Sequence, residues 1–228
     1  MIQKENTFAF LAAKGTSEGL PGKNIKLLGG KPLIAYTIEA AQKSGKVEKV
    51  FVSTDSQDIA DIAEKYGAEV IWETEENGKY PYDLSTESYL RFAVDKAKES
   101  SHQVELIVFL QVTSPFIKPG EISSAIDKIN EENYDSIVGV FKTFRYFGKV
   151  NENGEYVPLR EVRKRRQEME PWYCDNGALY VLKDSILGEY KNRYGGKIGI
   201  FEMSEEDSME VDDERDWKRV ERKIIEEN

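Results

Sequence analysis

The sequence predicts an α/β fold, built on a mostly parallel β-sheet with helices on both faces. Apolar runs of strand length alternate with segments whose apolar residues recur at helical spacing. Parallel strands need a crossover between them, and each helical segment supplies one. With 228 residues the chain is long enough for one domain, expected to span 1–228, whose core needs no covalent cross-link.

Strands are predicted where short apolar runs end in polar or turn-forming residues. The run 7–13 is typical of a buried strand, and 104–112, with the sequence VELIVFLQV, is expected to be the central one. Apolar residues at successive positions indicate strands that are covered on both faces. The other strands of this region are expected at 47–53, 69–72 and 136–141.

Helices are predicted between these strands, at 32–44, 58–66, 86–99 and 119–132. Pro32 and Pro119 suit a first helical turn, whose N–H groups have no partner within the helix. Ser85 is placed to cap the helix that follows it. Gly67 permits the left-handed backbone conformation that often closes a helix.

Beyond residue 141 the alternation stops. The turn sequence N-E-N-G at 151–154 lies between two short extended runs and predicts a hairpin. A basic cluster follows, composed of Arg160, Arg163, Lys164, Arg165 and Arg166. Further strands are expected at 178–182 and 198–201, and an amphipathic helix from about Glu214 onward. The segment 144–172 is interpreted as an insertion that acts as a dimerisation arm.

Composition argues against several classes of function. The net charge of −10 disfavours a nucleic-acid partner, because binding to a phosphate backbone needs clustered Lys and Arg. One histidine, His102, leaves little for His-based catalysis or His metal sites. One cysteine, Cys174, allows no internal disulfide and favours a reducing, cytoplasmic location. No apolar run is long enough for a signal segment or a membrane span, so no membrane partner is expected.

In a parallel sheet, ligands bind outside the carboxyl ends of the strands, so the informative loops are 14–23, 54–55 and 112–118. The first is rich in glycine and contains Lys14 and Lys23, a composition suited to phosphate. It matches neither a Walker loop nor a dinucleotide fingerprint, and a plain turn is the alternative.

Carboxylates and amides form a second group of candidates. Asp55 follows a strand, and acidic residues crowd 207–213; such groups can hold Mg²⁺, although most acidic runs in a chain with 42 acidic residues are merely solvated. Gln111 leaves the central strand together with two hydroxyl side chains and could bind a base, a ribose or a sugar. An ordinary capped turn is the alternative there, as it is for Asn176-Gly177.

Taken together and in order, these stretches resemble the acylneuraminate cytidylyltransferase family. The resemblance covers almost the whole chain. Its motifs here are AKGTSEGLPGKN at 13–24, GKPLI at 30–34, VSTD at 52–55, QVTSP at 111–115, RRQE at 165–168, NGALY at 176–180 and DSMEVD at 207–212.

The resemblance implies a Rossmann-like, glycosyltransferase-A-like nucleotidyltransferase. Such an enzyme transfers CMP from CTP to the anomeric hydroxyl of an acidic nine-carbon sugar, such as a sialic, legionaminic or pseudaminic acid, with Mg²⁺ as cofactor and as a homodimer. It implies catalytic roles for Lys23 and Asp212 and metal ligation by Glu210 and Asp212. The implied nucleotide contacts are Ala13, Lys14, Gly15, Ser17, Lys23, Asn24, Asp55 and Gln111. The implied sugar contacts are Gln111, Arg165, Arg166, Gln167, Asn176 and Tyr180.

Several positions depart from the family pattern. Lys14 stands where the family has arginine, Glu18 where it has lysine, and Ile117 where it usually has arginine. Glu210 replaces an aspartate, which keeps the carboxylate but makes it one methylene longer. Two alternatives therefore stay open: a related nucleotidyltransferase that uses another nucleotide, such as GTP, or another sugar, and a non-catalytic relative that serves as a binding subunit.

Overall fold

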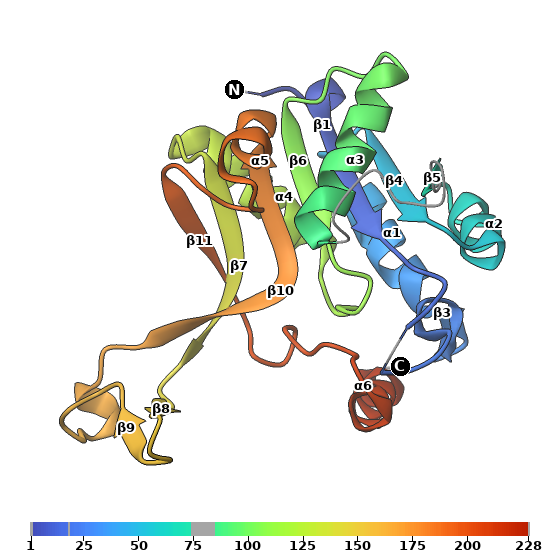
Figure 1. Ribbon diagram of the computed structural model, residues 1–228. Coiled ribbons are helices and arrows are strands. Elements are labelled where there is room, and N and C mark those ends of the chain that lie inside the picture. Colours follow the sequence, from blue (N-terminus) through green and yellow to red (C-terminus); the bar gives the residue numbers. More distant parts are fainter. Residues whose placement is uncertain (1, 18, 74–84, 228) are drawn as a thin grey trace.

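The computed structural model describes residues 2–17, 19–73 and 85–227 (Figure 1). Seven of the described strands form one sheet in the order β11-β7-β10-β6-β1-β4-β5. Their bounds are β1 (Thr7–Ala12), β4 (Lys49–Thr54), β5 (Glu69–Trp72), β6 (Leu106–Leu110), β7 (Ser136–Thr143), β10 (Trp172–Lys183) and β11 (Ile198–Met203). Glu18 and residues 74–84 lie outside the described part. The departure from the family pattern at Glu18 therefore falls outside the described residues.

The predicted mixed, mostly parallel α/β sheet is confirmed. β1 pairs in parallel with both β4 and β6, so that Phe10 lies opposite Phe51 on one side and Phe109 on the other. β4 pairs in parallel with β5, and β7 with β11. β10 runs antiparallel to both of its neighbours, β6 and β7, a direction that the sequence pattern had not indicated.

Helices cover both faces of the sheet. One face carries α1 (Leu33–Lys43), α2 (Gln57–Lys65), α4 (Pro119–Glu131) and α6 (Glu214–Glu227), and the other carries α3 (Thr86–Glu99) and α5 (Asp184–Tyr190). Successive side chains of a strand point to opposite faces, so Ala9 and Leu11 of β1 join the first layer while Phe8 and Phe10 join the second. Each layer forms its own apolar core, and the sheet lies between them.

The predicted elements are found with small changes at their ends. Ser85 caps α3 by accepting a hydrogen bond from Ser88 N at 3.2 Å, and Gly67 closes α2 with φ of +82°. The predicted strand 178–182 is the inner part of the longer β10. The helix α5 and the short pair β2 (Leu27–Leu28) and β3 (Lys31–Pro32) were not predicted, because each is too short to show a period.

An arm projects from one end of the sheet, as Figure 1 shows. It contains the predicted hairpin, formed by β8 (Gly148–Val150) and β9 (Tyr156–Pro158), and a single 3-10 turn, Arg166–Glu168. Asn151 stabilises the hairpin turn, since its Oδ1 accepts hydrogen bonds from the backbone N–H of Asn153 and Glu155. Gly154 adopts φ of +80° there, which favours glycine. None of the described helices combines the length and apolar character that crossing a membrane requires.

Candidate functional site

A cavity of about 290 Å³ lies at the carboxyl ends of β1 and β6. Three segments far apart in the sequence form it: the loop after β1, the first turn of α3 and the loop after β6. This is the edge at which ligands bind in parallel sheets. Its lining residues are Ala12, Lys14, Thr16, Ser17, Lys23, Asn24, Thr86, Phe109, Gln111, Val112 and Thr113.

The loop after β1 is held in place by two polar side chains. Asp55, at the end of β4, accepts a hydrogen bond from Gly15 N at 2.7 Å. Asn24 is buried and donates from Nδ2 to the carbonyl of Lys14 at 3.0 Å. Both predicted residues therefore position the loop, as does the buried Ala13, whose N–H donates to the carbonyl of Ser53. This arrangement leaves Lys14 at the cavity, with Nζ 4.2 Å from the centre of the Tyr89 ring.

The acidic loop 207–213 packs against the first loop. Lys23 Nζ donates to the carbonyl of Val211 at 2.9 Å and lies 3.3 Å from Asp212 Oδ1. A Cβ atom added to Gly19 would overlap the carbonyl oxygen of Asp212, so glycine is required for this close approach. Thr113 fixes the same loop by accepting from Val211 N at 2.9 Å. The predicted catalytic pair, Lys23 and Asp212, is thus brought together across 189 positions of sequence.

Glu210 and Gln111 converge on the backbone of Gly177. A Cβ atom at that position would overlap Glu210 Oε1 and would lie 3.1 Å from Gln111 Nε2. Gly177 also has φ of +69°, a conformation that L side chains rarely adopt. A larger residue there would be strained and would displace the Glu210 carboxylate, so the backbone conformation and the close approach of Glu210 both favour glycine at this position.

The pKa of Glu210 is raised from its ordinary value of 4.5 to about 7, first by burial and then by the negative charges of Asp212 and Asp175. The positive charge of Lys23 partly opposes this rise. A bound cation would relieve this unfavourable burial of charge, so the carboxylates of Glu210 and Asp212 fit the Mg²⁺ that the sequence predicts. Within the described ranges no three His, Cys, Asp or Glu side chains gather closely enough to hold a metal ion. Mg²⁺ typically takes one or two carboxylates and completes its octahedron with water and substrate phosphates.

A second cavity, of about 330 Å³, lies on the other side of the acidic loop. Glu210 and Asp212 line it, while their neighbours Gln111 and Lys23 line the first cavity, so the two carboxylates lie between the two spaces. Arg145 and Arg219 provide positive charge in this second cavity. The arrangement offers one space beside the phosphate-type loop and a second space on the far side of the carboxylates.

Asn176 and Tyr180, two of the predicted sugar contacts, direct their polar atoms into the protein. Asn176 is buried, donates from Nδ2 to Ser208 Oγ at 2.9 Å and accepts from Ala178 N. The Tyr180 hydroxyl donates to Asp175 Oδ1 at 2.6 Å. Both side chains shape the wall of the site. Asp175 was missed at the sequence level, and its position directly before Asn176-Gly177 was the available signal.

Arg165, Arg166 and Gln167 lie on the exposed arm, away from the loops that form the first cavity (Figure 1). Arg165 lies 3.7 Å from Glu168, and Arg166 lies over the ring of Phe144 at 5.0 Å. The fold of a single chain does not bring these three residues to Glu210 and Asp212.

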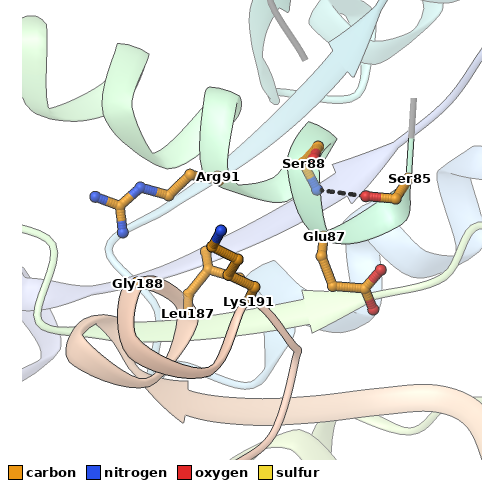
Figure 2. A pocket seen from close by; sticks show the side chains of 7 residues that line it. All are labelled: Ser85, Glu87, Ser88, Arg91, Leu187, Gly188 and Lys191. Atoms are coloured by element: carbon orange, nitrogen blue, oxygen red, sulfur yellow. Dashed lines mark hydrogen bonds between the residues drawn. The ribbon is translucent and has the colours of Figure 1, made fainter. Parts of the chain in front are cut away.

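A further cavity, of about 470 Å³, lies between α3 and α5 (Figure 2). Its lining residues are Ser85, Glu87, Ser88, Arg91, Leu187, Gly188 and Lys191. None of the site residues predicted from the sequence lines this space. Lys14, Ser17, Lys23, Asn24 and Gln111, which the sequence predicted, line the first cavity instead.

Comparison with known proteins agrees with this arrangement. A family model described as Cytidylyltransferase matches residues 9–226. N-acylneuraminate cytidylyltransferase A of Danio rerio is 34% identical over 226 residues, which cover 95% of this chain and 50% of that protein. The CMP-N,N'-diacetyllegionaminic acid synthase of Legionella pneumophila is 32% identical over 224 residues, which cover 94% of each. The chain thus spans about half the length of the first of these relatives and almost all of the second.

A solved structure of CMP:2-keto-3-deoxy-manno-octonic acid synthetase complexed with CTP has a similar fold. Its TM-score is 0.72 at 16% sequence identity, over 97% of this chain and 99% of that one. At this level of identity the likeness concerns the fold, which is that of an α/β nucleotidyltransferase.

Proposed function

This chain belongs to the cytidylyltransferase family, and from that premise we propose that it transfers CMP from CTP to an acidic nine-carbon sugar. The observation that carries the proposal is the contact of Lys23 with Val211 and Asp212, which unites a phosphate-type loop with a pair of carboxylates. The printed names of two relatives, an N-acylneuraminate cytidylyltransferase and a CMP-N,N'-diacetyllegionaminic acid synthase, support this class of sugar.

In the proposed reaction the anomeric hydroxyl oxygen of the sugar attacks the α-phosphorus of CTP. A new oxygen–phosphorus bond forms, the bond to the β-phosphate oxygen breaks, pyrophosphate leaves and the hydroxyl proton is released. The protein needs no covalent nucleophile, because such transfers depend on positioning and on neutralising charge at the phosphate oxygens. A chain with one histidine is compatible with this chemistry.

The residues of the first cavity receive roles on this basis. Lys23 and Lys14 neutralise the phosphates, and Ser17 and the backbone N–H groups of the loop add neutral donors. Gln111 binds the ribose, the base or the sugar from the floor of the cavity. Asp55 and Asn24 hold the loop that carries the lysines, as their hydrogen bonds to it indicate.

Glu210 and Asp212 are the residues that would hold Mg²⁺. When bound, the cation would supply positive charge to the phosphate oxygens. Lys23 already lies against Asp212, so it can shift from this carboxylate to a phosphate without a large movement. We also propose a cytoplasmic location, because a chain with one cysteine suits a reducing compartment.

The activity is tested by incubating the protein with CTP, Mg²⁺ and single sugar acids of the sialic, legionaminic and pseudaminic type. Chromatography of the CMP-sugar and release of pyrophosphate are measured, with GTP, ATP and UTP as controls for the nucleotide. Asp212→Asn should lower turnover on the order of a thousand-fold, because cation-borne charge stabilisation amounts to several kcal/mol. Glu206→Gln, which changes an exposed carboxylate directly before the same loop, is the matched control. Turnover with GTP alone, or none with any sugar acid, would overturn the proposal.

We also propose that the protein acts as a C2 homodimer through the arm. Val150, Tyr156 and Val162 of the arm are exposed to 71%, 62% and 65%, and a two-stranded hairpin is marginal in water by itself. A second copy would cover these side chains and could bring Arg165 and Arg166 to the partner's site. Light scattering at micromolar concentration should give twice the mass of one chain, and Val150→Asp should reduce it. A monomer mass for the unaltered protein contradicts this assembly.

A further inference from the structure

Four polar side chains beside the candidate site form a continuous run, in which each contacts the next through a hydrogen bond, a cation–π contact or an ion pair. The run begins at Asp175, beside Gly177, and continues through Tyr180 and Arg193 to Glu87 in the first turn of α3. It therefore joins β10 to the helix on the far side of the site. None of the roles assigned above explains why so many polar groups are gathered here.

The inner end of the run is an ion pair with little exposure. Arg193 Nε lies 2.7 Å from Glu87 Oε1, and the two side chains are 18% and 24% exposed. The guanidinium also lies over the rings of Tyr180 at 5.0 Å and Phe109 at 5.6 Å. Figure 2 shows Glu87 directed away from the Ser85–Ser88 cap of α3. A cation held by a carboxylate and two rings has few positions open to it, so it fixes both rings.

Tyr180, whose ring is held by Arg193, in turn holds Asp175 through a hydrogen bond. Its ring is 3% exposed and stacks against Tyr194, with an angle of 17° between the two planes. Burial, and then the hydrogen bond to Asp175, raise the pKa of Tyr180 far above its usual value. The phenol therefore remains protonated and donates to Asp175 Oδ1 at 2.6 Å at any working pH.

Asp175 itself is exposed, and Glu210 lies against Gly177, two residues further along β10. Its Oδ1 accepts from Tyr180 and also from Gly177 N at 3.0 Å. Its charge contributes to the raised pKa of Glu210, which places the two carboxylates within electrostatic range of each other. Two protein donors hold Oδ1 and so restrict the orientation of the carboxylate. A fixed carboxylate oxygen is a strong acceptor for a sugar hydroxyl.

We propose that Asp175 binds a hydroxyl group of the sugar substrate, and that Tyr180, Arg193 and Glu87 are positioning residues that fix its carboxylate. This inference rests on the proposed function, since it concerns the second substrate of that reaction. The inference also predicts how the sugar is oriented in the site. The charge of Asp175 repels the carboxylate of an acidic sugar, so the sugar binds with a hydroxyl toward Asp175 and with its own carboxylate away from it.

Steady-state kinetics with CTP and a sugar acid test the inference. Asp175→Asn keeps an oxygen for Tyr180 and Gly177 but removes the charge, so the KM for the sugar should rise about tenfold or more. The KM for CTP should stay within about twofold of the unaltered value, because the first cavity is unchanged. Tyr180→Phe should raise the same KM to a smaller extent, since Gly177 still binds Oδ1.

The positioning role is tested at Arg193. Arg193→Met should raise the KM for the sugar. Arg193→Lys should raise this KM less, because lysine keeps the positive charge but lacks the planar guanidinium group. Arg91→Met, on the same helix as Glu87 and paired with Asp95 on the surface, is the control and should change neither KM. Melting temperatures of all variants separate a loss of folding from a loss of sugar binding.

The outcomes distinguish this inference from the function on which it rests. An active unaltered protein whose Asp175→Asn variant has an unchanged sugar KM overturns the inference alone. Equal increases in the KM values for sugar and CTP also overturn it, because a general disturbance of the site would be responsible. A protein that transfers CMP to no sugar acid overturns both.

Discussion

Because the charge of Glu210 is partly buried beside other carboxylates, we predict that a single substitution at this residue should stabilise the metal-free protein while it impairs catalysis. Glu210→Gln replaces a partly buried charge, set beside Asp212 and Asp175, with a neutral amide of nearly the same shape. The folded protein holds the proton of Glu210 up to about pH 7, whereas the unfolded chain releases it near 4.5. Between these values the folded state binds more protons, so its stability falls as pH rises through this window.

The size of the effect follows from the pKa of Glu210. A change from 4.5 to about 7 corresponds to at most about 3.5 kcal/mol, because each tenfold change in proton affinity is worth about 1.4 kcal/mol. Partial exposure of the side chain and screening by solvent reduce this to about 1–2 kcal/mol. For a domain of this size that is a rise in melting temperature of about 2–8 °C above neutral pH, and little change near pH 5.

Thermal unfolding in a chelator, with and without excess Mg²⁺, is the appropriate assay. At about pH 8 the metal-free Glu210→Gln variant should melt above the unaltered protein, and at about pH 5 the two should coincide. Mg²⁺ should stabilise the unaltered protein at the higher pH and stabilise the variant less, because a ligand has been lost. A variant that melts lower at high pH, or by the same margin at both values, would refute the electrostatic account of this site.

Further predictions concern the loop contacts and the phosphate site. Lys23→Met should weaken CTP binding about 10- to 100-fold in calorimetry, since a charged hydrogen bond contributes about 1.5–3 kcal/mol, while Lys46→Met, which removes a surface pair with Asp127, should leave it unchanged. Gly19→Ala should separate the first loop from Asp212 and lower turnover, whereas Gly120→Ala, which meets no atom within 4 Å, should not. Comparable turnover of the two alanine variants would argue against the close approach of the loops.

Local patterns were sufficient for most of the fold. A strand covered on both faces has apolar residues at every position, as in 104–112, and a helix over a sheet has them at every third or fourth position. Both patterns depend on which surfaces lose water, so they are visible in a single sequence. They also located the ligand-binding edge, because parallel strands end on the same side. The loops 14–23 and 112–118 were expected there and line the first cavity.

The partners of the site residues were not visible in this way. These contacts depend on how loops separated by many residues pack against each other. Examples are the contact of Lys23 with Asp212 and the approach of Glu210 and Gln111 to Gly177. The same holds for Asn176 and Tyr180, whose polar atoms bond to the protein, and for Asp175, whose hydrogen bonds to Tyr180 and Gly177 only the fold creates. The arm was predicted as an insertion for dimerisation, and the structure adds that its residues Arg165, Arg166 and Gln167 are exposed in the single chain.

The sequence alone therefore determined the layers of this protein, the edge of the sheet at which the candidate site lies and the residue types available there. Only the tertiary structure decided the direction of β10, the exclusion of any side chain at Gly177 and the raised pKa of Glu210. The physical reason is one of range. Periodicity reports the burial of a segment against water, whereas hydrogen bonds, steric overlap and the interaction of charges depend on distances between segments that no single stretch of sequence contains.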